Sequence, residues 1–475
     1  MIVNRNTFAP RRSSTLSCLL GLSLLVGCQN SPSEMSTPDL ANPNPNPDLS
    51  GPAEAEPKLV SISADGHDRF FGVAFDPQGN FYATGTVADS TAGTADFKTV
   101  VAKFNAAGEL DKTFGANGYA IHNVIVGAGG EHGRSIVVQP SGKLVVVGPV
   151  EHMGATDTRD RDIALVRFNA NGTLDTTFGT GNGVTILDLS AGELVGSTYV
   201  ADNAWGLTGY SDGRLLVHGS KKRTGGTDTD FALIRLSADG MVDMTFGMQG
   251  TAAIDINNRS ASPRSATLLA DGSIIGTGYM NDGGPVKAVL YKLNSSGQID
   301  TTFGVNGFFI NNVLTATTEA YAAVLQGTSF VTTGYGRNDG TESIDWVSLR
   351  ITAAGTLDPT YGTGGYVRID NAGFDDNSRA LAVLPDNRLL LVGGGRTATM
   401  NSDAMIAVLT PNGAKDTTFS QTGTRLYDLG GNSDFFWGAA VSPDKSIAAL
   451  VGTKAILMGD AGNDDAAIMV LPLAK

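Results

Sequence analysis

The stretch Leu110-Asp111-Lys112-Thr113-Phe114-Gly115 decides the fold, because it returns five more times with small changes. We call the six copies the Phe-Gly phrases. Their aromatic residues stand 57 to 68 residues apart, at Phe114, Phe178, Phe246, Phe303, Tyr361 and Phe419. A repeat of nearly constant length indicates one supersecondary unit copied along or around an axis. In each copy we expect the Asp to cap a turn, the ring to fill the space between units, and the Gly to adopt a backbone conformation closed to other residues.

Each unit has room for four short strands. In one unit the alternating apolar pattern predicts strands at residues 135–139, 144–150, 162–168 and 183–189, with a tight hairpin turn at residues 140–143. Gly is abundant, with 61 of 475 residues, and apolar patterns of helical period are absent after residue 27. Four antiparallel strands per repeat are typical of a β-propeller blade, so the sequence predicts an all-β fold.

The number of blades follows from the hairpin turns. They occur seven times, against six Phe-Gly phrases, at residues 77–80, 140–143, 211–214, 270–273, 326–329, 385–388 and 443–446. The seventh unit stops after its third strand, whereas residues 58–63 precede the first unit and have the pattern of a lone fourth strand. We therefore expect a closed seven-bladed β-propeller of four-stranded antiparallel blades, in which the N-terminal strand completes the last blade and removes two open sheet edges.

The same residues resemble the delta-60 repeat family of bacterial secreted and lipid-anchored proteins. The third-strand segment Asp230–Leu236 matches that pattern well, and the acidic start returns at Asp162, Asp345, Asp403 and Asp465. The chain departs from the pattern at Lys98, Lys287 and Ser420. The resemblance covers residues 69–471 and implies a propeller fold and a place in the cell envelope, but no reaction.

Residues 1–27 have the features of a secretion signal. A basic start is followed by the apolar run Leu16–Gly27, which at 12 residues is too short to span a bilayer as a helix. The run ends in Leu25-Val26-Gly27-Cys28, which resembles the lipobox of bacterial lipoproteins, and this implies a lipid-modified Cys28. Gln29 after the cysteine favours the outer membrane, facing the periplasm or the cell surface.

The remaining chain divides into two parts. Residues 28–57 are rich in Pro and Asn and predict an unpacked tether, and residues 58–475 form the propeller. The formal net charge of −14 argues against nucleic acid and anionic membrane surfaces as partners, so the expected membrane contact runs through the lipid anchor alone. The only cysteines are Cys18 and Cys28, which leaves no disulfide for the mature chain, and we expect a monomer.

One set of aligned residues is a candidate binding site. The position just before each innermost strand holds Phe71, Arg134, Trp205, Arg264, Tyr321, Arg379 and Trp437, which we call the channel ring. In a propeller these residues lie near one mouth of the central channel. Flat aromatic rings stack on sugars or apolar groups, and guanidinium groups bind carboxylates or phosphates. The alternative is that each side chain packs between blades or stacks on its neighbour.

Other chemistry finds little support. Gly209-Tyr210-Ser211-Asp212-Gly213 fits a hydrolase motif but falls on a predicted hairpin turn, where the motif has no function. The histidines lie in unrelated repeat positions and are expected in solvent, at His67, His122, His132, His152 and His218. The acidic clusters are expected to lie in solvated loops, since the calcium-loop pattern is missing, with one or more weak calcium sites as the alternative, at Asp157/Asp160/Asp162, Asp228/Asp230, Asp375/Asp376 and Asp464/Asp465. No catalytic residue, metal or cofactor is predicted.

These features favour a lipid-anchored envelope protein that binds or scaffolds without catalysis. A glycan, a peptide, a protein or an anionic molecule would contact one channel mouth. One alternative is a propeller enzyme of the hydrolase, lactonase or quinone-dependent dehydrogenase type, which would need inward-facing acids, histidines or metal ligands. The inner strands instead carry small apolar residues, as in Gly72-Val73-Ala74 and Gly438-Ala439-Ala440. A purely structural envelope protein is the third alternative.

Overall fold

The computed structural model describes most of the chain after residue 54. The described residues are 55–473 except residues 65, 91–94, 128–129, 152–160, 196–197, 224–225, 227, 257, 399–400 and 457–462. Within them the regular structure is strand only, and no helix of membrane-spanning length and hydrophobicity occurs. The predicted signal segment, Cys28, nearly all of the tether and His152 lie outside the described residues.

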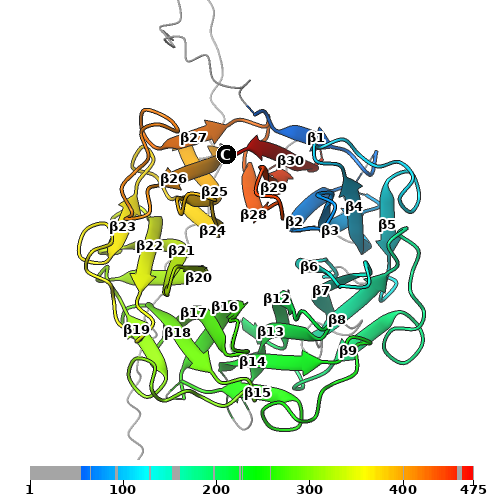
Figure 1. Cartoon of the computed structure of the whole chain (residues 1–475), viewed down its shortest axis with the longest axis horizontal. Helices are drawn as coiled ribbons and strands as arrows, with labels where there is room; N and C mark the ends of the chain where they lie inside the picture. Colours follow the sequence, from blue (N-terminus) through cyan, green and yellow to red (C-terminus); the bar gives the residue numbers. More distant parts are fainter. Residues whose placement is uncertain are drawn as a thin grey trace, which may run out of the picture. The chain divides into compact units, whose positions relative to one another are not determined.

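Seven four-stranded antiparallel sheets surround a central axis (Figure 1). Blades 1 to 3 consist of β2 (Asp68–Phe75), β3 (Phe81–Ala88), β4 (Phe97–Phe104), β5 (Tyr119–His122); β6 (Ser135–Val138), β7 (Leu144–Glu151), β8 (Arg161–Phe168), β9 (Val184–Leu187); and β12 (Asn203–Gly209), β13 (Leu215–Lys222), β14 (Thr229–Leu236), β15 (Thr251–Ile254). Between blades 2 and 3 lies a small hairpin of β10 (Glu193–Val195) and β11 (Thr198–Val200).

Blades 4 to 7 repeat the arrangement. They consist of β16 (Ser260–Leu268), β17 (Ile274–Asn281), β18 (Lys287–Leu293), β19 (Phe308–Asn311); β20 (Thr317–Gln326), β21 (Ser329–Arg337), β22 (Asp345–Ile351), β23 (Tyr366–Ile369); β24 (Asn377–Val383), β25 (Leu389–Ala398), β26 (Asn401–Leu409), β27 (Thr424–Tyr427); and β28 (Phe435–Val441), β29 (Ile447–Lys454), β30 (Asp465–Pro472), β1 (Lys58–Val60). In every blade the first strand lies innermost, and first strands of neighbouring blades contact each other around the whole ring.

The ring closes as the repeat count predicts. Strand β1 pairs antiparallel with β30, Lys58 opposite Ile468 and Val60 opposite Ala466, so the last blade receives its fourth strand from the N-terminal side of the chain. The fully buried Asp464 ties this blade to the first, since its carboxylate pairs with Arg69 and its backbone N–H donates to His67 Nδ1. The predicted all-β, seven-bladed fold is therefore confirmed.

The Phe-Gly phrases join neighbouring blades. In all six, Oδ1 of the Asp accepts the N–H two residues on, at 2.9 to 3.1 Å. The first five aromatic rings are at most 2% exposed. The first five glycines have φ between 53° and 65°, and each donates its N–H to the carbonyl just before the glycine of a turn in the next blade, as Gly115 does to Asn171 O at 2.8 Å. All three predicted roles are confirmed for those five phrases.

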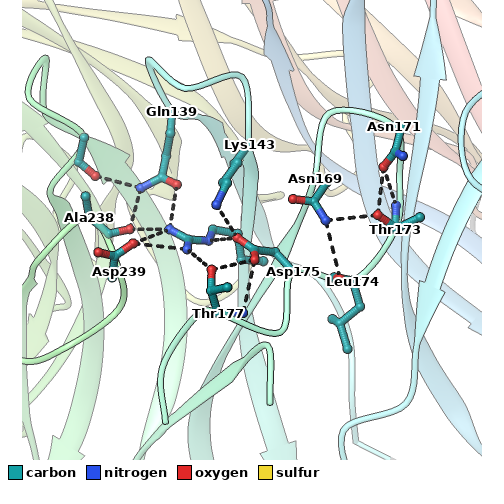
Figure 2. Close-up of polar contacts among 12 residues, drawn as sticks. Gln139, Lys143, Asn169, Asn171, Thr173, Leu174, Asp175, Thr177, Ala238 and Asp239 are labelled. Carbon is teal, nitrogen blue, oxygen red and sulfur yellow. Dashed lines mark hydrogen bonds and ion pairs between the residues drawn. The ribbon is translucent and has the colours of Figure 1, made fainter. Parts of the chain in front are cut away.

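A buried arginine completes the junction in three blades. Figure 2 shows the network around Asp175, Thr177 and Asp239. Arg167 on β8 pairs with Asp175 at 2.7 Å and crosses to the next blade, where it contacts Asp239 at 3.1 Å and donates to Ala238 O at 2.7 Å. Its guanidinium carbon stands 4.7 Å from the Phe178 ring centroid. Arg235 and Arg350 repeat the pattern, so these cations serve to hold blades together.

Candidate binding site

A β-bulge positions the channel ring. The first strand of six blades loses register with the second strand at one equivalent place, between Phe70/Gly72, Ala204/Gly206, Pro263/Ser265, Ala320/Ala322, Ser378/Ala380 and Phe436/Gly438. The residue skipped by the ladder is in each case the channel-ring residue. In blade 2, β6 begins directly after Arg134. A bulge leaves one residue unpaired and redirects its side chain, which explains how six of the blades present this position to the axis.

All seven ring residues line one central cavity of about 450 Å³. Most of the remaining wall comes from the residues that follow them on the inner strands, mainly small ones such as Gly72, Ala322 and Gly438. The structure therefore brings together every residue that the alignment of the repeats assigned to this mouth. The volume of the cavity lies within the range of small-molecule binding sites.

The ring side chains stack on one another without a break. The guanidinium carbon of Arg134 lies 5.5 Å from the Phe71 centroid and 5.1 Å from that of Trp205. The same carbon of Arg264 lies 3.9 Å from Trp205 and 4.4 Å from Tyr321.

Arg379 continues the stack, 4.1 Å from Tyr321 and 5.6 Å from Trp437, and Phe71 meets Trp437 edge-on at 5.6 Å. The ring side chains thus stack on their neighbours, as the alternative to a binding site expected. The same side chains also line the cavity.

The three arginines differ in their hydrogen bonds. Arg264 donates to Ser262 Oγ at 2.8 Å, Pro263 O at 3.3 Å and Tyr279 OH at 3.1 Å. Arg379 keeps Nε and Nη1 buried without any hydrogen-bond partner. The guanidinium of Arg134 makes no hydrogen bond to any residue that the structure describes. Arg264 Nε is also buried without a hydrogen-bond partner, so all three cations have donors to spare, Arg134 and Arg379 the most.

Positive charge dominates this part of the channel. Burial, together with the charges of Arg264 and Arg379, lowers the pKa of Arg134 to about 10. The nearby acid is Glu319 on β20, whose pKa is raised by burial and held down in part by Arg264. Within the described residues no channel-ring arginine forms an ion pair. An anion entering the cavity would relieve the mutual repulsion of these cations.

His218 was missed as a wall residue of the cavity, and its expected exposure to solvent is wrong. It is 5% exposed and stands opposite Gly206, where an added Cβ would come within 2.1 Å of its imidazole. Burial lowers its pKa to about 3, so it is neutral, and burial lowers the pKa of His132 to about 3 as well. The glycine facing a histidine across the hairpin was the sequence signal for this placement.

The acidic clusters were also expected in solvent, and for one residue of each cluster this is wrong, while Asp157 and Asp160 lie outside the described residues. Asp162, Asp230, Asp376 and Asp464 are all buried. Three groups recur where one blade passes to the next and bring carboxylate oxygens within 4.8 Å, namely Asp162/Asp188/Asp202, Asp345/Asp370/Asp376 and Asp403/Asp428/Asp434. In the second group Arg368 supplies a positive charge to Asp345, and Asp376 accepts the N–H groups of Asn371 and Arg396. Such contacts give these acids a structural role at the junction.

The hydrolase-like string lies where it was expected. Gly209 ends β12 and Leu215 begins β13, so the serine of this string sits in a hairpin turn. Tyr210 O accepts the N–H of Gly213, which closes the turn. The strand-to-helix elbow that the motif requires is not formed here.

Comparison with known proteins supports the fold. The family model described as "Domain of unknown function (DUF5122) beta-propeller" matches residues 139–178, 211–246 and 269–303. None of the curated proteins compared with the chain matches it.

Among solved structures, the chain is similar to Sqt1 of Chaetomium thermophilum bound to the N-terminus of ribosomal protein L10, with 13% identity, 87% of this chain and 100% of that chain covered, and a TM-score of 0.39. It is also similar to an α-L-arabinanase of Penicillium chrysogenum complexed with arabinobiose, with 11% identity, 85% of this chain and 93% of that chain covered, and a TM-score of 0.42. A third similar structure is the polysaccharide lyase Uly1, with 10% identity, 90% of this chain and 94% of that chain covered, and a TM-score of 0.46. At such identities the likeness concerns the propeller fold alone.

Proposed function

We propose that this chain is a lipid-anchored cell-envelope propeller that binds an anionic ligand at one mouth of its central channel without catalysing a reaction. The ligand classes are an acidic glycan, an acidic peptide or another small anionic molecule. The envelope location and the anchor rest on the lipobox-like residues before Cys28, and the outer membrane is the proposed site. The propeller acts as a monomer held off the membrane by residues 28–57.

One observation supports the binding site most directly. Seven bulges or strand starts bring four aromatic rings and three arginines to one cavity, and Arg379 offers two buried N–H donors that nothing in the described chain accepts. A buried donor left without a partner costs about 1–3 kcal/mol. A ligand that accepts these hydrogen bonds recovers that cost, which favours a binding role over simple packing.

The test of binding compares two double variants of the full-length chain. Arg134→Ala/Arg379→Ala removes the two arginines with the most unpaired donors, and Lys112→Ala/Arg259→Ala removes the same charge at exposed positions. Both proteins, and the unaltered chain, are titrated with a panel of acidic and neutral saccharides and peptides. Binding that disappears only in the first variant supports the channel mouth. Binding by none of the proteins would leave a structural role as the better explanation.

The test of anchoring is separate. Cells expressing the chain are grown with a labelled fatty acid, and the label on the purified protein is compared with that on Cys28→Ala. We expect label on the first protein only, and recovery of the first protein in the outer-membrane fraction. Equal labelling of the two proteins would contradict the proposed anchor.

A further inference from the structure

The channel ring is not uniform. Arg264 is held by three hydrogen bonds from Nη1 and Nη2 and stacked between Trp205 and Tyr321, so that only its Nε lacks a partner. Arg379 keeps Nε and Nη1 buried without acceptors, and Arg134 makes no hydrogen bond to a described residue. These two flank the arc formed by Phe71 and Trp437, which contact each other edge-on.

The charges along the ring do not cancel. Blades 2, 4 and 6 supply three guanidinium groups, and two of them, Arg264 and Arg379, interact with the buried carboxylate of Glu319, which is also hydrogen-bonded to Tyr335. Arg134 therefore has no acid beside it among the described residues, and Arg379 shares Glu319 with Arg264. A ligand with two negative charges matches the excess of two, whereas a ligand with one leaves a buried cation without compensation.

The arc between these arginines is apolar. Phe71 and Trp437 form it, and the wall beyond them carries small side chains, including Val73, Ala380 and Ala439. A polar body such as a phosphate alone would leave this surface without contacts. An aromatic or other flat apolar body would bury it, and aromatic pairs prefer the edge-to-face and offset geometries that this arc permits.

We infer that the channel selects a dianionic group carried on a flat apolar body, with the group held between Arg134 and Arg379 and the body against Phe71 and Trp437. This inference rests on the proposed function and narrows its ligand class. A phosphate monoester and a dicarboxylate share this chemistry. Arg264 shapes the aromatic wall and is a positioning residue in this scheme.

The experiment uses the full-length chain and probes that differ in charge but little in shape. Phenyl phosphate carries close to two charges at pH 8, because its second pKa is about 6 for a phosphate monoester, whereas phenyl sulfate carries one. Phthalate and benzoate form the matching carboxylate pair. Dissociation constants are measured by titration calorimetry at fixed ionic strength, because charge-assisted binding depends on salt.

We expect at least one dianion to bind about tenfold more tightly than its matched monoanion, since one added charge-assisted hydrogen bond contributes about that factor. The phosphate pair and the carboxylate pair show which dianion the channel accepts. Arg134→Gln and Arg379→Gln should each bring the ratio close to one, while the exposed control Arg259→Gln leaves it unchanged. Circular dichroism of each variant establishes that it is folded. The ratio of dianion to monoanion affinity in the unaltered chain tests the inference even if a variant fails to fold.

The outcomes separate this inference from the proposed function. Equal binding of dianions and monoanions, lost in Arg134→Ala/Arg379→Ala, overturns the dianion inference and leaves anion binding at the channel in place. Binding of no probe, together with no binding across the saccharide and peptide panel, overturns both. A ratio that survives Arg379→Gln would place the dianion elsewhere and also overturn the inference.

Discussion

At the scale of single residues, the aromatic member of a Phe-Gly phrase is a buried plug between two blades. Phe246 is fully buried, so Phe246→Ala should lower the free energy of unfolding by about 3–5 kcal/mol. Phe419 belongs to the phrase that has Ser420 in place of Gly, and it is only partly buried. Phe419→Ala should therefore cost clearly less. Denaturant unfolding of both variants measures the difference, and equal losses would contradict the plug role.

Buried acids at the junctions make stability depend on pH. Burial raises the pKa of Asp376 to about 7, above its usual value near 4, so the native state binds a proton that the unfolded chain releases. Stability contributed by this group is therefore present at low pH and is lost as the pH rises from about 4 to 7. In Asp376→Asn the loss of stability between pH 4 and pH 7 should be smaller, even though the substitution itself lowers stability. Unfolding midpoints at pH 4.5 and pH 7.5 for both chains supply the comparison.

At the scale of elements, the closure of the ring depends on one short strand. Strand β1 has three residues and pairs with β30, which becomes an open edge without it. Removal of residues 1–63 should lower the unfolding temperature and promote association through that edge. Removal of residues 1–54 spares β1 and serves as the control. Size-exclusion chromatography and thermal unfolding test this, and a stable monomer in the longer deletion would contradict the closure.

Elements also show where prediction from sequence succeeds and where it ends. The hairpin at residues 443–446 and the lone strand pattern at residues 58–63 were enough for the blade count and the closure, because both are local patterns. The bulge at each ring position was not predicted, since it is visible only in the pairing of two strands. The unequal hydrogen bonding of Arg264 and Arg379 depends on neighbours such as Tyr279, which share the blade but lie outside the aligned position. Burial of His218 likewise depends on the facing strand.

At the scale of the whole molecule, the channel is the one place where all seven blades meet. Arg379 and Arg134 come from blades on either side of the closing junction, with Trp437 and Phe71 from the two blades that form it. A ligand that contacts both arginines therefore bridges the junction beside the blade that the three-residue strand β1 completes. Because it binds the native state alone, it stabilises the fold by about 2.7 kcal/mol at a hundred times its dissociation constant.

The stabilisation by a bound ligand should be concentrated in the strands next to the closing junction. Bound phenyl phosphate should slow amide hydrogen exchange most in β1, β2 and β28, because opening the ring at the closing junction now requires release of the ligand. Exchange in the outer strands β15 and β19, far along the ring from the closure, should change less. The same measurement on Arg134→Ala/Arg379→Ala with the probe present is the control. Slowing confined to blades 3 and 4 would place the ligand away from the Phe71–Trp437 arc, since a ligand protects the opening motions that its own contacts oppose.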